Sequence, residues 1–350
     1  MKNRPRITGA KRAAYFGSGQ SVLKFLIVAT FVFFPVVGTA QDLSFPSGTA
    51  GDAATVEKAL PALAEQVIAG YKENNRVTYL DNLFRLQIVA GRYADALQSL
   101  ATLHELNLNP QSPATAAYNV QDEIFVRAKL IEGAEKLPFN EAFQRAFREK
   151  FRVLDDRVSA LVIRTFNVPE QAVRADFDNS VAKQKGKSTI TLADALALVR
   201  ADQIDEEFRA FGPLVSPLIA EEDGRRYLFE KNMQIKTPDS ATICAHIMRP
   251  RSTTARLPTL VEFTIYNDAN PATIARDMRR GASNGYASVV GFTRGKACSP
   301  DQSVPYEHDG ADAASLIDWI TKQSWSDGRV GMYGGSYSGF TPWATAKFRP

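Results

Sequence analysis

The chain has 350 residues, of which 45% are hydrophobic, 23% charged and 10% aromatic, and this globular balance excludes a disordered tail, a collagen-like fibre and a disulfide scaffold. Its formal net charge is +4, but six of its 42 basic residues and no acidic residue precede residue 41, which leaves 36 basic against 38 acidic residues. A remainder of about −2 excludes the electrostatic footprint of a nucleic-acid-binding protein.

Residues 1–40 have the order of a secretory signal peptide. A basic stretch is followed by an apolar run over residues 25–38 and by small residues ending in Ala40, which signal peptidase accepts. A retained membrane anchor is the alternative, but the run has 14 residues and contains Pro35, whereas a spanning helix needs about 20. We therefore expect export to the periplasm or medium, cleavage near Ala40 and no stable membrane anchor.

Residues 41–224 have a helical pattern and are predicted to form an all-α domain. Phe143, Phe147 and Phe151 recur at helical spacing with charged residues between them, which predicts one apolar core stripe on a solvated helix. Residues 90–110 resemble the turn and second helix of a tetratricopeptide repeat. Since such repeats need about three copies to bury their apolar faces and one is present, an ordinary helical hairpin is the favoured interpretation.

From residue 225 onward the pattern alternates between strands and helices. This alternation predicts a mostly parallel sheet with flanking helices, entered by an antiparallel pair of strands. The predicted strands are residues 233–237, 242–248, 259–266, 287–292 and 330–333, and the predicted helices are residues 272–284 and 311–323.

Residues 331–339, GMYGGSYSG, carry the strongest chemical signal. A short strand enters a turn of small residues and continues into an apolar segment, which is the pattern of a nucleophile elbow around Ser336. Gly334 meets the requirement for a small residue two positions before the serine, whereas Ser338 replaces the second glycine of the strict motif. The alternative interpretation is a flexible Gly/Ser loop.

From about Asn232 to its last residue, the chain resembles the X-Pro dipeptidyl-peptidase and cocaine esterase family of serine hydrolases. The family elbow reads G-x-S-Y-x-G, and the resemblance rests on Gly334, Ser336, Tyr337 and Gly339, on the lead-in over residues 325–332, and on the segments Thr293-Arg294-Gly295 and Asp318-Trp319-Ile320. The resemblance covers about the last third of the chain and implies an α/β-hydrolase fold.

The resemblance also implies roles for three residues. Ser336 would attack a carbonyl carbon and form an acyl-enzyme, and the backbone N–H of Tyr337 would bind the oxyanion. Tyr266, at the end of the third strand, would supply the second donor through its hydroxyl, although without the resemblance it would be taken for an aromatic rim residue. The chain departs from the family at Phe292, where an aspartate is usual, and Pro342 lies near the first turn of the helix after the elbow.

A serine nucleophile needs a histidine base oriented by a carboxylate, and in α/β-hydrolases both follow the serine. The 14 residues after Ser336 contain no Asp, Glu or His. The chain has three histidines, of which His104 and His246 are expected to be structural and His308 a solvated imidazole. We therefore expect the chain to be a fragment that contains the incomplete first half of an α/β-hydrolase and is inactive alone.

Cys244 and Cys298 are the two cysteines of the chain. If the second strand runs antiparallel beside the fourth, as in α/β-hydrolases, the two residues come close enough to pair, and whether they form a disulfide stays open. A zinc site built from Cys244 and His246 lacks further ligands.

These observations favour an exported serine hydrolase that cleaves a small ester, an amide or a short peptide, including the bond after an X-Pro dipeptide. The organisation is a signal peptide over residues 1–40, a helical domain over 41–224 and a partial hydrolase domain over 225–350. No metal, organic cofactor or nucleic-acid partner is implied. The alternative is an exported interaction protein whose helical domain binds a protein partner and whose hydrolase-like region is inactive.

Overall fold

A computed structural model describes residues 43–45, 53–266, 271–348 and 350. The expected signal peptide over residues 1–40 lies outside these described residues. No helix within the described ranges is both long and apolar enough to cross a membrane.

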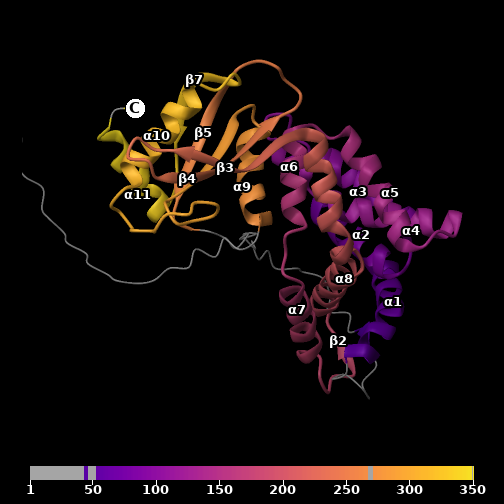
Figure 1. The fold of residues 1–350 in the computed structure, drawn as a ribbon. Helices are drawn as coiled ribbons and strands as arrows, with labels where there is room; N and C mark the ends of the chain where they lie inside the picture. The colour runs from indigo at the N-terminus through magenta and orange to yellow at the C-terminus, as the bar shows by residue number, and fades with distance from the viewer. Residues whose placement is uncertain (1–42, 46–52, 267–270, 349) are drawn as a thin grey trace, which may run out of the picture. The chain divides into compact units, whose positions relative to one another are not determined.

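The first part of the described chain is built mainly from helices (Figure 1). Phe143, Phe147 and Phe151 are buried at its core, as the helical spacing predicts, and the ring of Phe143 stacks on that of Phe211 at 5.4 Å between centroids. The helical elements are α1 (Ala53–Gly70), α2 (Arg76–Val89), α3 (Tyr93–Asn107), the 3-10 helix η1 (Pro113–Ala117), α4 (Val120–Glu135), α5 (Phe139–Val153), α6 (Asp156–Thr165), α7 (Glu170–Ala182) and α8 (Leu192–Arg226).

The predicted hairpin over residues 90–110 is formed by α2 and α3. Gly91 makes the turn between them with φ of 73°, a left-handed conformation that glycine adopts without steric cost. Ala96 is fully buried, so its small side chain allows the two helices to pack closely.

The prediction of an all-α domain is corrected by a small sheet. Strand β1 (Leu43–Ser44) pairs antiparallel with β2 (Thr189–Ile190). Leu43 and Ile190 both turn into the apolar core formed by α1, α7 and α8, and their burial stabilises the short pairing. Two-residue strands carry too little periodicity to be detected in the sequence.

The second part is a five-stranded sheet with helices. The strand order is β3-β4-β6-β5-β7, with the first three strands antiparallel and the last three parallel. The described sheet is therefore mixed rather than mostly parallel. Its elements are β3 (Tyr227–Lys236), β4 (Thr242–Pro250), β5 (Leu257–Thr264), α9 (Pro271–Ala282), β6 (Ala287–Phe292), α10 (Asp309–Thr321), β7 (Ser326–Met332) and α11 (Tyr337–Ala346).

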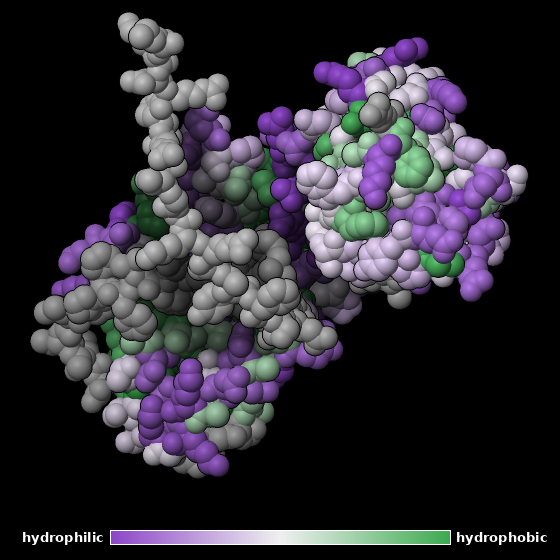
Figure 2. Space-filling model, turned by 90° about the vertical axis from the view of Figure 1, so that its left-hand side faces the viewer, coloured by the Kyte–Doolittle hydropathy of each residue, from purple (hydrophilic) through white to green (hydrophobic). Residues whose placement is uncertain are grey.

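Helices cover both faces of this sheet (Figure 1). Ile243 and Ile247 of β4 face one core, which α10 closes, whereas Cys244 and Met248 face the other, which α9 closes. This alternation follows from the period of two along a strand. In the face shown in Figure 2, hydrophilic side chains (purple) are interspersed with smaller hydrophobic areas (green).

The change from helix to strand falls between Arg226 and Tyr227, two residues after the predicted boundary. Arg226 is buried and donates from Nη1 to Asp156 Oδ1 at 2.6 Å and from Nη2 to Phe151 O at 2.7 Å. These contacts anchor the start of β3 on α5 and α6.

Candidate active site

Ser336 lies in a sharp turn between β7 and α11. Its backbone has φ of 54° and ψ of −124°, a conformation that L-residues rarely adopt. A Cβ atom added to Gly334 would lie 2.3 Å from Ser338 O, so the chain can make this turn only with glycine at that position. The turn therefore has the backbone geometry of a nucleophile elbow.

Ser338 replaces the second glycine of the strict motif without opening the turn. Its buried side chain donates from Oγ to Thr264 Oγ1 at 3.0 Å, which ties the start of α11 to the end of β5. Gly339 of α11 also lies close to Gly334, since an added Cβ at Gly339 would lie 3.3 Å from Gly334 O.

Tyr266 comes to the same turn from β5. The strand ends at Thr264, two residues earlier than the predicted strand, and the hydroxyl of Tyr266 lies 3.1 Å from Ser336 Oγ. The side chain is 54% exposed. It is thus an exposed aromatic residue, as the alternative interpretation expects, and it also contacts the candidate nucleophile.

Tyr337 is the first residue of α11, where backbone N–H groups have no partner within the helix. Its buried ring carries a hydroxyl that donates to Asp309 Oδ2 at 2.6 Å. The backbone N–H of Tyr306 approaches both Tyr337 Oη at 3.0 Å and Asp309 Oδ2 at 2.9 Å. The structure therefore joins the elbow to the start of α10.

Asp309 and Tyr306 were not predicted from the sequence as site residues. An aspartate at the start of a helix is expected to interact with the helix dipole, and no local signal pairs it with a tyrosine 28 residues later. Burial raises the pKa of Asp309. Burial and the bond to Asp309 raise the pKa of Tyr337, so its hydroxyl stays protonated and remains a donor.

Phe292 stands where the resembled family has an aspartate, and it is fully buried at the end of β6. Arg294, two residues later, forms ion pairs with two other aspartates. Its Nη2 lies 2.7 Å from Asp312 Oδ1 and 2.8 Å from Asp239 Oδ2. Hydrogen bonds from Thr237 and Arg294 lower the pKa of Asp239 to about 2.

Pro342 lies inside α11, deeper than the first turn, and it removes the N–H that would reach Ser338 O. The hydroxyl of Thr341 lies 3.1 Å from that carbonyl and 2.9 Å from Phe263 O. The single hydroxyl proton is shared between the two carbonyls, so it compensates in part for the missing helix bond at Ser338 and ties the helix to β5.

The three histidines have other surroundings. His104 lies on α3, His246 Nδ1 accepts the backbone N–H of Asn232 at 3.1 Å, and His308 Nε2 lies 3.6 Å from Glu307 Oε1. Burial lowers the pKa of His246. Among the described residues, the hydrogen bond of Ser336 Oγ goes to Tyr266 and none goes to a histidine.

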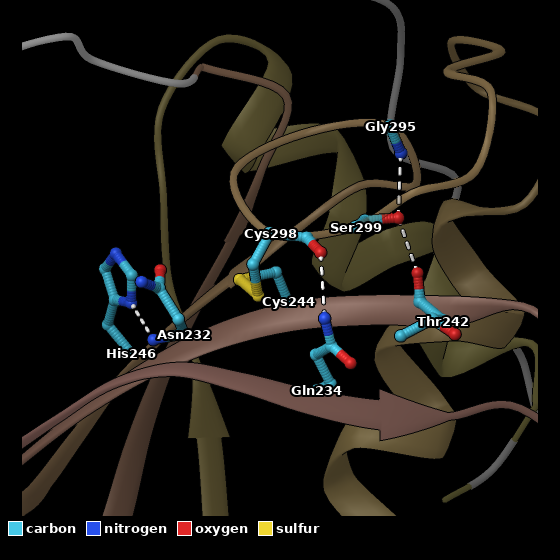
Figure 3. The surroundings of a disulfide bond; sticks show 8 residues. All are labelled: Asn232, Gln234, Thr242, Cys244, His246, Gly295, Cys298 and Ser299. Carbon is cyan, nitrogen blue, oxygen red and sulfur yellow. Dashed lines mark hydrogen bonds between the residues drawn. A yellow bond between two sulfur atoms is a disulfide. The ribbon is translucent and has the colours of Figure 1, made fainter.

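Cys244 and Cys298 form a disulfide (Figure 3). The strand pairing that this contact requires is present, since β4 and β6 are antiparallel with Cys244 opposite Phe292. Around it, Gln234 Nε2 donates to Cys298 O at 3.3 Å and Ser299 Oγ to Thr242 O at 2.5 Å. Within the described ranges, no group of three His, Cys, Asp or Glu side chains is placed to hold a metal ion.

The C-terminal third of the chain matches known hydrolases. Residues 239–350 match the family model described as X-Pro dipeptidyl-peptidase (S15 family). The match confirms the resemblance to this family over residues 239–350. The chain is also 32% identical over 123 residues to cocaine esterase from Rhodococcus sp. (strain MB1 Bresler), an alignment that covers 34% of this chain and 21% of that protein.

Two solved structures of lower similarity cover the same share of the chain. A CocE/NonD family hydrolase from Staphylococcus aureus has 22% identity and a TM-score of 0.32, over 35% of this chain and 26% of that one. An α-amino acid ester hydrolase has 25% identity and a TM-score of 0.30, over 34% of this chain and 23% of that one. The chain thus spans about a fifth to a quarter of the length of these relatives.

Proposed function

We propose that the protein is a serine hydrolase in which Ser336 attacks the carbonyl carbon of an ester or amide. The observation that carries this proposal is the turn itself, with Ser336 at positive φ and its Oγ 3.1 Å from Tyr266 Oη. The S15 match over residues 239–350 supports it.

The reaction follows from the groups around Ser336. Attack by Oγ forms a C–O bond, passes the hydroxyl proton to a general base and moves the carbonyl π electron pair onto oxygen. The backbone N–H of Tyr337 and the hydroxyl of Tyr266 donate to this oxyanion. Collapse breaks the bond to the alcohol or amine, which takes that proton from the base, and leaves an acyl-enzyme. Water then attacks the acyl group, which releases a carboxylic acid and restores the Ser336 hydroxyl. We assign Ser336 as the nucleophile, and the backbone N–H of Tyr337 and the hydroxyl of Tyr266 as the oxyanion donors. We assign the role of general base to none of the three histidines.

The substrate that we propose is a small ester, an amide or a short peptide, including a peptide with an X-Pro N-terminus. The exposure of Tyr266, at 54%, supports a substrate that approaches from solvent. A chromogenic X-Pro amide and a simple aryl ester, compared by kcat/KM, separate peptidase from esterase preference.

A fluorophosphonate probe tests the proposed function, because it labels only a serine that is activated as a nucleophile. We expect the full-length protein to be labelled and the Ser336→Ala variant to lose the label. A full-length protein that ignores the probe, with unchanged properties after Ser336→Ala, would favour an exported interaction protein whose helices bind a partner.

We also propose that the protein is exported after cleavage near Ala40. The disulfide between Cys244 and Cys298 supports an oxidising compartment. Cell fractionation and N-terminal sequencing of the mature protein test this, with Gln41 expected as its first residue and a retained Met1 as the contrary result.

A further inference from the structure

Asp309 has an environment that helix capping does not explain. It is the first residue of α10 and is 2% exposed. Its Oδ2 atom lies 2.6 Å from Tyr337 Oη and 2.9 Å from Tyr306 N. Its Oδ1 atom is buried and has no hydrogen-bond partner among the described residues. Burying a carboxyl group with one unpaired oxygen costs free energy. The contacts of Oδ2 must therefore provide a benefit that offsets this cost.

Tyr306 shows that this contact is held under strain. Its backbone has φ of 69°, which is unfavourable for a bulky residue and is found where the surroundings enforce it. The single N–H of Tyr306 points at both Asp309 Oδ2 and Tyr337 Oη. Its ring packs on the ring of Tyr337 at 4.7 Å between centroids.

These contacts control the orientation of Tyr337, the residue after the candidate nucleophile. Its hydroxyl is held by Asp309, and one edge of its ring meets Tyr266 at 6.2 Å between centroids. A side chain fixed at both its hydroxyl and its ring restricts its own backbone, and the N–H of Tyr337 starts α11 beside Ser336. An aligned donor is worth more to an oxyanion than a mobile one.

We propose that Asp309 is a positioning residue that fixes the oxyanion-binding N–H of Tyr337 by holding the Tyr337 hydroxyl. This inference rests on the proposed function of Ser336. Asp309 acts through Tyr337, since its hydrogen bonds go to Tyr337 and Tyr306. The hydrogen bond between Asp309 of α10 and Tyr337 of α11 thereby links Tyr306, in the connection between β6 and α10, to the geometry of the elbow.

The variants Asp309→Asn and Tyr337→Phe test the proposal in the full-length protein. Hydrolysis of p-nitrophenyl acetate gives kcat and KM separately. We expect each variant to lower kcat about tenfold with KM nearly unchanged, because the donor acts on the transition state rather than on bound substrate. The double variant should be no slower than Tyr337→Phe, since that variant has already lost the hydrogen bond to Asp309. Asp318→Asn on α10 and Tyr286→Phe, both remote from this bond, are the matched controls.

The outcomes separate this inference from the proposed function. Wild-type kcat in Asp309→Asn and Tyr337→Phe, or a rise in KM alone, overturns the positioning role while hydrolysis still depends on Ser336. If Asp309→Asn does not fold, Tyr337→Phe decides, because it removes one oxygen and keeps the ring. Hydrolysis that survives Ser336→Ala overturns the proposed function itself, and the positioning role falls with it.

Discussion

At the scale of single residues, the candidate site depends on backbone conformations that cost free energy. Ser336 and Tyr306 both have positive φ, at 54° and 69°, and such conformations cost about 1–3 kcal/mol each. Hydrogen bonds and packing at the elbow must offset this cost. Gly334 allows the turn for a steric reason, because any side chain at this position would fill the space that Ser338 occupies.

Replacing Gly334 tests the crowding at the elbow. In Gly334→Ala the new Cβ would lie 2.3 Å from Ser338 O and 2.5 Å from Ser338 Cβ, so the turn must open and displace Ser336. We expect fluorophosphonate labelling to slow by about 100-fold, the effect of a small misplacement of reacting groups. Gly335→Ala is the control, because an added Cβ there meets no atom within 4 Å. Equal labelling of both variants would contradict the elbow.

Removing the Tyr266 hydroxyl tests the second donor. We expect Tyr266→Phe to lower kcat by about 100-fold with little change in KM, since one oxyanion donor is lost. Tyr118→Phe is a matched control because Tyr118 is 53% exposed, against 54% for Tyr266. An unchanged kcat would show that Tyr266 is only a rim residue.

At the scale of elements, the connection between β6 and α10 is fastened to the sheet at several points. The disulfide joins Cys298 to β4, and Asp301 Oδ2 accepts the backbone N–H of Thr242 at 2.7 Å. Further along the same connection, Tyr306 reaches Tyr337 of α11. The connection between β6 and α10 thereby links β4 to the candidate site.

Reduction of the disulfide tests this fastening. The bond closes a loop of 54 residues, and the loss of such a constraint lowers the free energy of unfolding by about 2–4 kcal/mol in the chain-entropy account. Urea unfolding of the oxidised protein with and without dithiothreitol measures the difference. The double variant Cys244→Ala/Cys298→Ala should have the free energy of unfolding of the reduced protein, with or without dithiothreitol. If dithiothreitol lowers the free energy of unfolding of this variant as much as that of the oxidised protein, the effect does not come from the disulfide.

At the scale of the whole molecule, the helical part buries several carboxylates along α8. Asp202, Asp205 and Glu207 are all buried. Arg174 pairs with Asp205 at 3.0 Å, whereas burial, followed by repulsion from Glu206, raises the pKa of Asp202 to about 7. Burial also raises the pKa of Glu207. The folded state thus takes up protons that the unfolded state releases.

The contribution of Asp202 to stability should therefore fall as the pH rises. Asp202 has a folded pKa above its unfolded value of 3.8, so its protonated form favours folding below about pH 4 and this contribution is lost as the pH approaches 7. Between pH 5 and pH 7 we expect the free energy of unfolding to drop by about 2 kcal/mol on this account. Asp202→Asn should reduce the drop, measured by urea unfolding at each pH, and the exposed Asp318→Asn should not. A drop of equal size in both variants would be contrary to this expectation.

Local patterns predicted much of the molecule. Strand β6 begins and ends where it was predicted, because a short apolar run between turn residues is typical of a strand buried on both faces. The apolar stripe with Phe147 forms the helical core, because the helix period is carried by neighbouring residues. The elbow was also readable, since Gly334, Ser336 and Gly339 lie within six positions of one another. The role proposed for Tyr266 came from family resemblance, and the two-residue strands left no periodic signal.

Contacts between distant residues depend on the tertiary structure. The strand order β3-β4-β6-β5-β7 brings Cys244 to Cys298 and Tyr266 to Ser336, and the packing of α10 on α11 brings Asp309 to Tyr337. Sequence by itself determined which residues could form strands, helices and a tight turn, because those preferences are local. Which side chains meet depends on how the elements stack, and that is set by burial summed over the whole fold rather than by any one segment.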